Sequence, residues 1–589
     1  MPPAEESFQS LVNKTFNANY NVGITQDLNG LPEEPIAPPF EFYDRHVSSN
    51  HILKNVVYLP SIPHLLSKTC DNAVRDFITN DHKFSYDGYD FDLEMPKEKF
   101  KDARSVGTYY SDNVGEISEA YMSKLCIHPY LDTWESVFQF QQDISNKTFY
   151  RSEGYLCLFM EPFRDFFSES MKEGLPISTQ VALRELFDKY PRQAMWHFFP
   201  MLDTFTTILR NVTKDIKFNW ETARTKGYEI KTHTGLPPDG EALTKKLHVN
   251  EMSRNRKFEP YSLATKKTVN KASKRVTPPQ KSTRSSYRPD FRHYLQHAWA
   301  QAAIYDTTFI IFNCGRYQRI GIRHRASQTL YLSGVIDTVN IQNPHYMKLN
   351  LGLLISIVRD ALERKKLVDS LVTNPEYNNI KTRSADNLED KETPKSKRQK
   401  QASGLFKCTD ILFKELVHRK LALVSLDYNA LCSPVPSSFI RIGESCMRDS
   451  PTEGTDWTND ECQQKIYSNQ EYFILKLLAP IGSGAIGVAH PAQVQLTLES
   501  GEVLEGNLVF KMAFTEERQQ KLKHEFEMYC RISRTEGIEG VVDVHGLFHD
   551  LESGAMGMLM ADGGQNLRQR EMERIGAYAE QVTTTWREK

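Results

Sequence analysis

The sequence predicts a multi-domain α+β protein with a helical N-terminal region, an α/β middle and a C-terminal unit of five antiparallel strands and one helix. Three observations lead to this fold class. Apolar residues recur at near-helical spacing in residues 178–190. A short apolar run at Phe309–Asn313 is typical of a buried strand. Residues 472–511 alternate strand-like runs with glycines. At 589 residues, the chain is long enough for roughly three or four domains.

Composition narrows the class of protein. The chain is 40% hydrophobic and 25% charged, with 73 Lys and Arg against 75 Asp and Glu, so its net charge indicates no particular partner. No apolar run reaches the roughly eighteen residues that span a bilayer, and the N-terminus lacks a signal-peptide pattern. Nine cysteines are scattered without CxxC spacing. We therefore expect an intracellular protein without membrane contact, with reduced thiols and without a metal site.

The chain divides where its composition changes. The expected segments are a flexible arm (1–45), a helical region (46–212), an α/β region (213–371) with a basic linker (245–288), a polar basic linker (372–403), a connector (404–470) and the strand-rich unit (471–589). Inside these segments we expect a helix at 292–306, the strand Phe309–Asn313, a hairpin at 319–334, and helices at 349–367 and 405–424.

The glycine triplet Gly482-x-Gly484-x-x-Gly487 lies between strands expected at 473–478 and 492–498. Glycines let phosphate oxygens approach backbone amides, and they tolerate positive φ in a turn. Such a triplet is often an ordinary turn, and it also occurs in dinucleotide-binding folds, where the third glycine opens a helix. Here the third glycine leads into a strand, which favours a phosphate loop between two strands.

A lysine and a glutamate follow this loop at informative positions. Lys511 ends the strand expected at 503–511, and the next helix is expected at 515–534. Within that helix, Glu525 has apolar Met528 and Tyr529 three and four residues later, a register that resembles the αC helix of a protein kinase. This resemblance implies that Glu525 is the partner of Lys511. Glu527 is the alternative, and it lies roughly 200° away around the helix. Two more strands are expected near 541–548 and 555–560, before Asp562.

This order of elements resembles the small lobe of a eukaryotic protein kinase. The resemblance implies that Lys511 contacts the α- and β-phosphates of ATP and pairs with Glu525. It further implies an ATP site formed by Ile481, Gly482, Ser483, Gly484, Ala485, Gly487 and Lys511, with Met560 near the gatekeeper and Asp562 at the ribose edge. Two positions depart from the kinase pattern: Ala489 replaces the valine after the glycine loop, and Val509 replaces the alanine before the lysine.

The part of the family pattern that transfers phosphate is missing from the sequence. No HRD-like, catalytic Asn or DFG-like segment follows Lys511, so we expect a chain truncated before the catalytic loop, with no catalytic residue of its own. ATP and Mg²⁺ are expected for a complete relative of the Ser/Thr kinase type. For this chain we expect weak or absent ATP binding, and a protein substrate or partner. The alternatives are a non-catalytic nucleic-acid-binding or scaffold protein, and a Mg-dependent nuclease-like protein.

Sequence features upstream point to a narrower family. Trp220, the Glu229-x-Lys231 pair, and the helix that carries Trp299 and Gln301 resemble the region before the kinase domain in fungal-type protein kinases. The resemblance covers roughly residues 180–580. It implies a restriction-endonuclease-like core in the middle of the chain.

Such a core uses carboxylates to hold Mg²⁺ beside a lysine. The nuclease-like candidates are Asp215, Glu229 and Lys231, although no Pro-Asp pair precedes them. An exposed charged pair on a strand is the simpler interpretation of Glu229 and Lys231, because E-x-K triplets are common by chance.

Two basic tracts lie between the expected domains. The first begins at Lys245, ends at Arg288 and holds thirteen Lys or Arg against two Glu. It predicts weak nucleic-acid contact through phosphate neutralisation, or a solvated linker that only separates domains. The second, PKSKRQK at 394–400, has the pattern of a nuclear import signal, so a nuclear location is a further expectation.

Overall fold

The structure is a computed structural model. It describes residues 7–18, 23–27, 35, 38–80, 82, 99–142, 151–158, 173–189, 192–222, 228–230, 287–373, 411–446, 465–533, 535, 541–550 and 552–563. Most of the first basic tract, Lys231, and the second basic tract therefore lie outside the described residues. Among the described helices, none combines the length and the apolar character that crossing a membrane requires.

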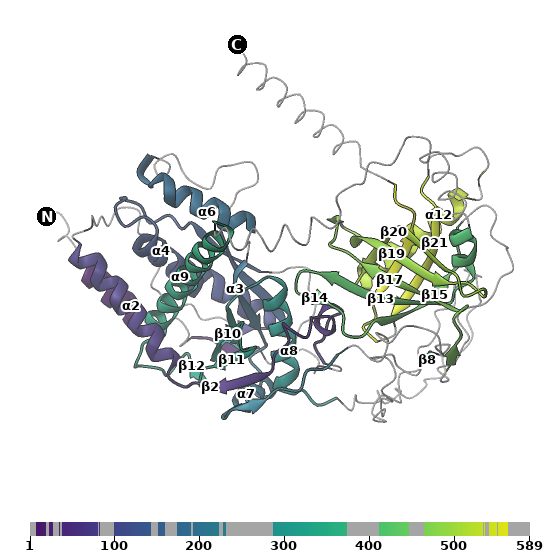
Figure 1. The fold of residues 1–589 in the computed structure, drawn as a ribbon. Helices are drawn as coiled ribbons and strands as arrows, with labels where there is room; N and C mark the ends of the chain where they lie inside the picture. Colours follow the sequence, from purple (N-terminus) through teal and green to yellow (C-terminus); the bar gives the residue numbers. More distant parts are fainter. Residues whose placement is uncertain are drawn as a thin grey trace, which may run out of the picture.

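The first half of the fold is built on a nine-stranded mixed sheet (Figure 1). Its strands in spatial order are β4 (Phe138–Gln142), β5 (Ser152–Leu158), β6 (Arg192–Phe198), β9 (Phe309–Asn313), β10 (Tyr317–His324), β11 (Thr329–Leu332), β2 (Asn55–Tyr58) and β7 (Ile216–Lys217), and β12 (Ile336–Asp337) pairs with β10. The β6–β9 and β11–β2 pairs are parallel, and the others are antiparallel. Strands from both ends of this half therefore share one sheet.

Helices cover both faces of this sheet because its central strands are apolar on both sides. On β6, Trp196 and Phe198 belong to one core cluster and Met195 belongs to the other. The first face carries α1 (Phe8–Asn17), α2 (Ile62–Thr79), α3 (Ala103–Tyr109), the π-helical turn η2 (Tyr110–Gly115), α4 (Glu116–Cys126), α6 (Ile177–Lys189) and α9 (Tyr346–Thr373). The second face carries α7 (Asp203–Arg210) and α8 (Phe291–Ile304).

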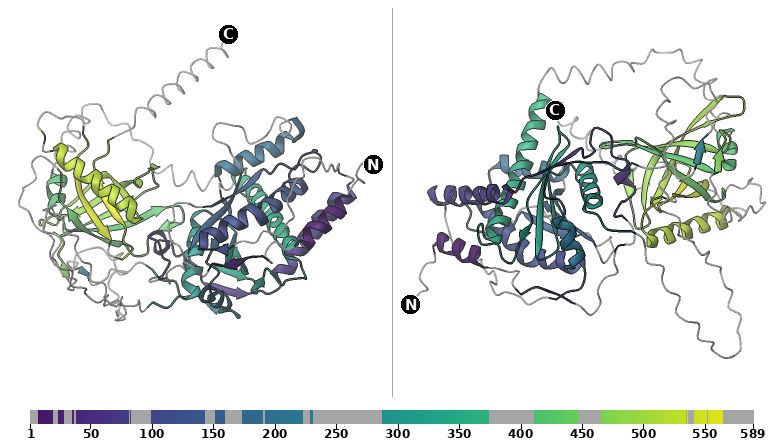
Figure 2. Two further views of the ribbon diagram at one scale, coloured as in Figure 1. Left: turned by 180° about the vertical axis from the view of Figure 1, so that it is seen from behind. Right: turned by 90° about the horizontal axis from the view of Figure 1, so that it is seen from below.

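The second half is a closed barrel of seven strands (Figures 1 and 2). Its strands in order around the barrel are β13 (Leu421–Tyr428), β15 (Ser437–Gly443), β21 (Val544–Asp550), β22 (Met556–Met560), β20 (Val503–Ala513), β19 (Val488–Thr497) and β17 (Tyr472–Leu477), which pairs with β13 in parallel and closes the ring. Two short strands, β14 (Leu431–Cys432) and β18 (Gly482–Ser483), pair antiparallel with β13 and β19, respectively. Helix α12 (Glu516–Ser533) follows β20 and packs on the outside, over Leu522.

A short segment at residues 38–48, with the 3-10 turn η1 (Tyr43–Arg45), joins the two halves. Phe42 and Val47 pack in the same apolar cluster as the barrel interior, together with Ala300 and Ala303 of α8. The two halves are therefore held by buried contacts, as well as by the chain itself.

Several sequence-based expectations are correct. Helices α6, α8 and α9, strand β9 and the antiparallel β10–β11 pair all lie where they were predicted. The five strands β17, β19, β20, β21 and β22 and the helix α12 also form, in the expected chain order. The predicted α+β class is correct at this level.

Other expectations are wrong. Residues 46–212 are not a helical region, because β4, β5 and β6 run through it and pair onward to β9. No boundary separates residues 46–212 from 213–371, since both contribute to one sheet. The arm 1–45 contains α1, whose N-cap Ser7 accepts a hydrogen bond from Ser10 N. The connector 404–470 supplies barrel strands, and the helix expected over 405–424 ends at residue 418, before β13.

The two remaining short pairings lie outside the main sheets. β1 (Thr25–Gln26) pairs with β3 (Lys99–Phe100), and β8 (Tyr228–Ile230) pairs in parallel with β16 (Lys465–Tyr467). The second pairing carries a residue predicted for the nuclease-like site into a sheet separate from the nine-stranded one.

Candidate functional site

The glycine triplet forms the tip of a β-hairpin at one end of the barrel. Gly482 pairs with Ala489 across β18 and β19, and Gly484 N donates to the carbonyl oxygen of Gly487 at 2.9 Å. Ala489 also pairs with Lys511 on β20. Gly482, Ala489 and Lys511 therefore lie in one row across neighbouring strands, so the Cα atoms of Gly482 and Lys511 are about 10 Å apart, or two strand spacings.

Lys511 and Glu525 form the ion pair that the sequence predicted. The Nζ atom of Lys511 donates to both carboxylate oxygens of Glu525, at 2.8 and 2.7 Å. Their side chains are 21% and 20% exposed, so the pair is shielded and still open to a ligand on one side. Glu527, the alternative partner, is exposed, because Leu522, Glu525 and Phe526 occupy the face of α12 that meets the barrel.

The three glycines of the loop have different surroundings. A methyl group at Gly487 would lie 2.1 Å from the carbonyl oxygen of Met512, whereas one at Gly482 or Gly484 would have no atom within 4 Å. None of the three has positive φ, so this loop does not use the left-handed conformations that glycine tolerates. Packing therefore requires a glycine at position 487. Gly482 and Gly484 instead leave open space beside the row formed by Gly482, Ala489 and Lys511.

The other predicted ATP-site residues lie around this row. Ile481 is 61% exposed, and Ser483 and Ala485 are exposed beside the two open glycines. Met560 ends β22, where it pairs with β20 and β21. Asp562 follows it on the surface.

Helix α12 is attached to the barrel at both ends. Thr515, just before the helix, accepts a 3.4 Å hydrogen bond from Arg518 N, and Gln519 donates to Gly554 O at 2.6 Å. Near its other end, Cys530 forms a disulfide with Cys446, which follows β15. The expectation that all cysteines are reduced is therefore wrong for this pair, whose members are far apart in the sequence and meet only when the barrel closes.

The nuclease-like candidates are not brought into one site. Asp215 accepts a 2.8 Å hydrogen bond from Tyr58 N at the β2–β7 edge of the nine-stranded sheet. Glu229 lies on β8, in the separate pair with β16, and Lys231 is outside the described residues. A site of two carboxylates around one metal ion requires them within a few ångströms, and these two belong to different sheets.

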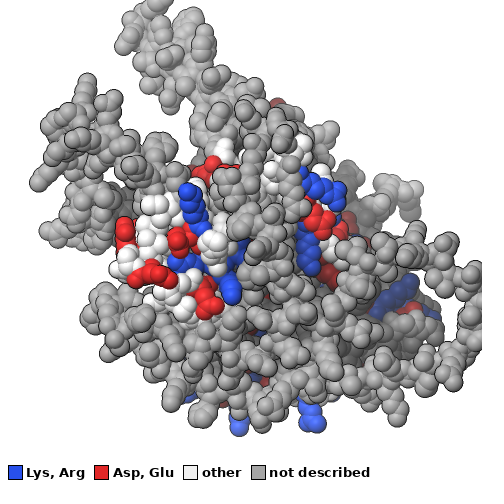
Figure 3. All heavy atoms as spheres, turned by 90° about the vertical axis from the view of Figure 1, so that its right-hand side faces the viewer, with Lys and Arg blue, Asp and Glu red and all other residues white. Residues whose placement is uncertain are grey.

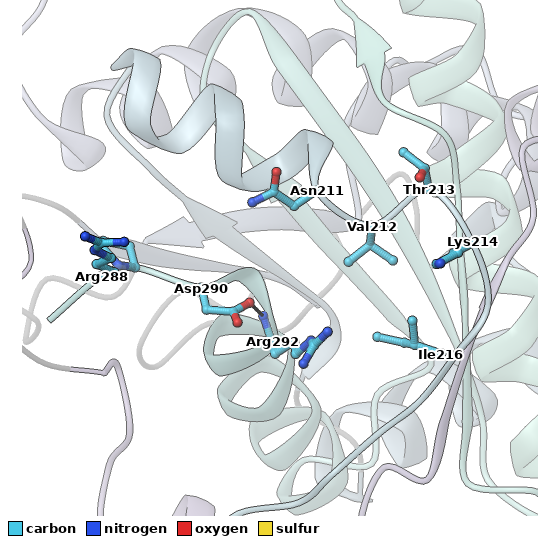
Figure 4. A pocket seen from close by; sticks show the side chains of 9 residues that line it. Asn211, Val212, Thr213, Lys214, Ile216, Arg288, Asp290 and Arg292 are labelled. Atoms are coloured by element: carbon cyan, nitrogen blue, oxygen red, sulfur yellow. Dashed lines mark hydrogen bonds between the residues drawn. The ribbon is translucent and has the colours of Figure 1, made fainter. Parts of the chain in front are cut away.

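A cavity of about 390 Å³ lies at the start of α8 (Figure 4). Exposed Lys214, Arg288 and Arg292 line it, and Asp290 caps the helix by accepting from Arg292 N at 2.9 Å. None of the predicted site residues lines this cavity. On the face of the molecule in Figure 3, basic and acidic side chains are interspersed over the part that the structure describes.

Sequence analysis missed a buried cluster in the first half of the protein. Glu153 on β5 and His197 on β6 are directly opposite each other across the two strands, and His297 of α8 lies above them. All three are buried, and one ligand atom of each lies within 4.8 Å of the others. The side chains come from three elements distant in the sequence, so no local spacing reveals them.

Hydrogen bonds hold the imidazole of His297 between two carboxylates. Its Nδ1 is 2.6 Å from Asp44 Oδ2, and its Nε2 is 2.8 Å from Glu153 Oε1. Burial and Arg151 act to lower the pKa of His297, but Asp44 and Glu153 outweigh them and raise it to about 10. Burial lowers the pKa of the neighbouring His197 to about 3.

No protein-family model matches this chain, and no curated protein is significantly similar to it.

Proposed function

We propose that the C-terminal barrel binds ATP as a protein-kinase-like small lobe of the fungal-type Ser/Thr kinase kind. The observation that carries this proposal is the Lys511–Glu525 ion pair. A kinase small lobe uses such a pair to hold a lysine in position for the α- and β-phosphates. Here the two side chains meet at 2.7 and 2.8 Å, although they are on different elements.

The glycine hairpin supports the proposal independently. Backbone amides can approach a polyanion only where no side chain intervenes. Gly482 and Gly484 have open space at their Cα atoms, and they share the end of the barrel with Lys511. Packing accounts for the glycine at position 487 only. We infer that Gly482 and Gly484 are glycines because a ligand approaches the backbone there.

The proposal stops at nucleotide binding. Phosphoryl transfer also needs a carboxylate that orients the attacking hydroxyl and further groups that hold Mg²⁺. The described residues supply the lysine, its glutamate and the open glycines, so ATP binding is the function that we propose.

The decisive experiment compares ATP binding by two lysine variants of the full chain. Lys511→Met removes the phosphate contact, whereas Lys521→Met removes an exposed lysine of α12 that pairs with Glu517 at 3.1 Å. A hydrogen bond to a charged group is worth roughly 1.5–3 kcal/mol, so we expect ATP affinity to fall about 10- to 100-fold in Lys511→Met and to stay unchanged in Lys521→Met. The ATP affinity of each variant is measured by equilibrium titration and by the ATP-induced rise in melting temperature.

Two results would contradict the proposal. The first is the absence of any ATP-induced shift at millimolar nucleotide in the unaltered protein. The second is equal ATP affinity in Lys511→Met and Lys521→Met, because binding would then occur elsewhere. Glu525→Gln supplies a further check, since it keeps the lysine and removes only the charge that positions it.

A further inference from the structure

The buried cluster around His297 has the composition of a metal-binding site. Two imidazoles and one carboxylate form a donor set found in zinc proteins, where three protein ligands leave a fourth position open. Glu153 and His197 face each other on adjacent strands, and His297 descends from the helix above. Strands and helices fix side chains more firmly than loops do, so these ligand atoms are already gathered by rigid elements.

We propose that Glu153, His197 and His297 bind one divalent transition-metal ion, and that Zn²⁺ suits this donor set best. Zn²⁺ holds nitrogen and oxygen ligands at about 2.0–2.1 Å, which places tetrahedral ligand atoms about 3.3 Å apart. Glu153 Oε1 is 2.8 Å from His297 Nε2 and 3.9 Å from His197 Nδ1. These two distances bracket the required value, and all three ligand atoms lie within 4.8 Å of one another.

The groups around the ligands are those that support a metal. Asp44 Oδ2 binds Nδ1 of His297, which directs Nε2 toward Glu153, and ligating histidines in proteins are usually oriented by such a carboxylate. The hydroxyl of Tyr155 donates to Glu153 Oε2 at 3.2 Å and leaves Oε1 directed at the histidines. The carboxylate that orients His297 comes from η1, on the segment that also packs against the barrel.

The charged groups around the ligands are mainly acidic. Asp44 Oδ2 and Glu153 Oε1 lie 2.6 and 2.8 Å from the two ring nitrogens of His297, and Arg151 contacts Glu41 and Glu153. The ion would replace the proton between His297 Nε2 and Glu153 Oε1, because metal binding requires a deprotonated imidazole nitrogen and releases its proton.

The ion would have a structural role. All three ligands are at least nine-tenths buried, so a substrate has no direct route to the open position. Through Asp44, the ion would fix the segment at residues 38–48 to the nine-stranded sheet. Because Phe42 and Val47 of this segment pack in the barrel cluster, the metal would couple the two halves of the protein.

The test is metal binding by the full chain after a chelator has stripped it. We expect one Co²⁺ per chain with the intense visible bands of tetrahedral coordination, displaced by one Zn²⁺. In His197→Gln, affinity should fall more than about 100-fold, and in Asp44→Asn about 10- to 100-fold, as for residues that orient a ligand. The control is His64→Gln, which alters an exposed histidine of α2 and should bind like the unaltered protein.

Each outcome decides the proposal. A stripped, folded protein that shows no tetrahedral Co²⁺ spectrum would overturn it, and so would His197→Gln binding the metal as tightly as His64→Gln. If His197→Gln does not fold, Glu153→Gln replaces it, and the Co²⁺ spectrum of the unaltered protein remains decisive. Loss of the nucleotide site leaves this result unaffected, because the cluster contains no residue of the barrel.

Discussion

Replacing the loop glycines one at a time separates packing from ligand binding. Gly487→Ala and Gly484→Ala make the same chemical change at two positions of one short loop. In the first, the added methyl group would lie 2.1 Å from the carbonyl oxygen of Met512 and 2.9 Å from its carbonyl carbon. In the second, the methyl group would meet no atom within 4 Å. We expect the two variants to differ sharply in stability.

The size of this difference in stability follows from the atoms that the added methyl group would meet at each position. The obstructing atoms at Gly487 are backbone atoms of β20, a strand paired on both sides, so the clash can be relieved only by distorting the sheet. Overpacking of this kind costs about 1–3 kcal/mol. At Gly484, removing glycine restricts the unfolded chain and stabilises the protein by about 0.4–1 kcal/mol. We therefore expect a gap of about 1.4–4 kcal/mol, or roughly 3–16 °C in melting temperature at about 2–4 °C per kcal/mol.

Thermal and urea unfolding of the full chain, followed by ATP titration, test this prediction. Gly487→Ala should lose stability, while Gly484→Ala keeps it. Gly484→Val should fold normally and bind ATP more weakly, because its branched side chain occupies the space above the loop. Equal destabilisation of the two alanine variants would refute the packing argument, and undiminished ATP binding in Gly484→Val would refute the role of the open glycine.

Two buried groups predict opposite responses to pH. Burial, opposed by a backbone hydrogen bond from Phe140, raises the pKa of Glu119 from 4.5 to about 8, so stability is fully present below pH 4.5 and is lost as pH rises through 8. Glu119→Gln should remove this loss, which amounts to up to about 4–5 kcal/mol in the free energy of unfolding measured between pH 5 and about 9. If the variant loses as much stability over this pH range as the unaltered protein, the prediction is contradicted. Burial lowers the pKa of His46, held by Ser433 and Ser437 at 2.7 and 2.9 Å, from 6.5 to about 3. The stability that His46 contributes is therefore fully present above pH 6.5 and is lost as pH falls toward 3. When the free energy of unfolding is measured against pH, His46→Gln should lose less stability in acid than His64→Gln. Equal losses in the two variants would exclude this contribution.

The local parts of the candidate site could be predicted because their signals are local. The strand–glycine–strand order requires only the alternation of neighbouring residues, and the strand of Lys511 follows through one hairpin. The choice of Glu525 over Glu527 came from the resemblance of its register to a kinase helix, and helical periodicity places Glu527 on another side of α12. These inferences needed no knowledge of distant contacts.

The closure of the barrel could not be predicted in the same way. The run Leu421–Tyr428 is a short apolar segment, and periodicity alone does not distinguish such a run as a strand or a helix. It becomes a strand because β15 and β17 pair with it on both sides. The misassigned region before residue 212 has the same cause, since β6 is buried on both faces and becomes a strand through its pairing with β5 and β9.

The sequence by itself determined the order of the glycine loop, the strand of Lys511 and the helix that carries Glu525. Only the tertiary structure decided that two further strands close this sheet into a barrel, and that Glu153, His197 and His297 meet. The physical reason is the distance along the chain over which each signal acts. Periodicity and turn chemistry act over a few neighbouring residues, whereas strand pairing and buried charge clusters join segments that become neighbours only when the core assembles.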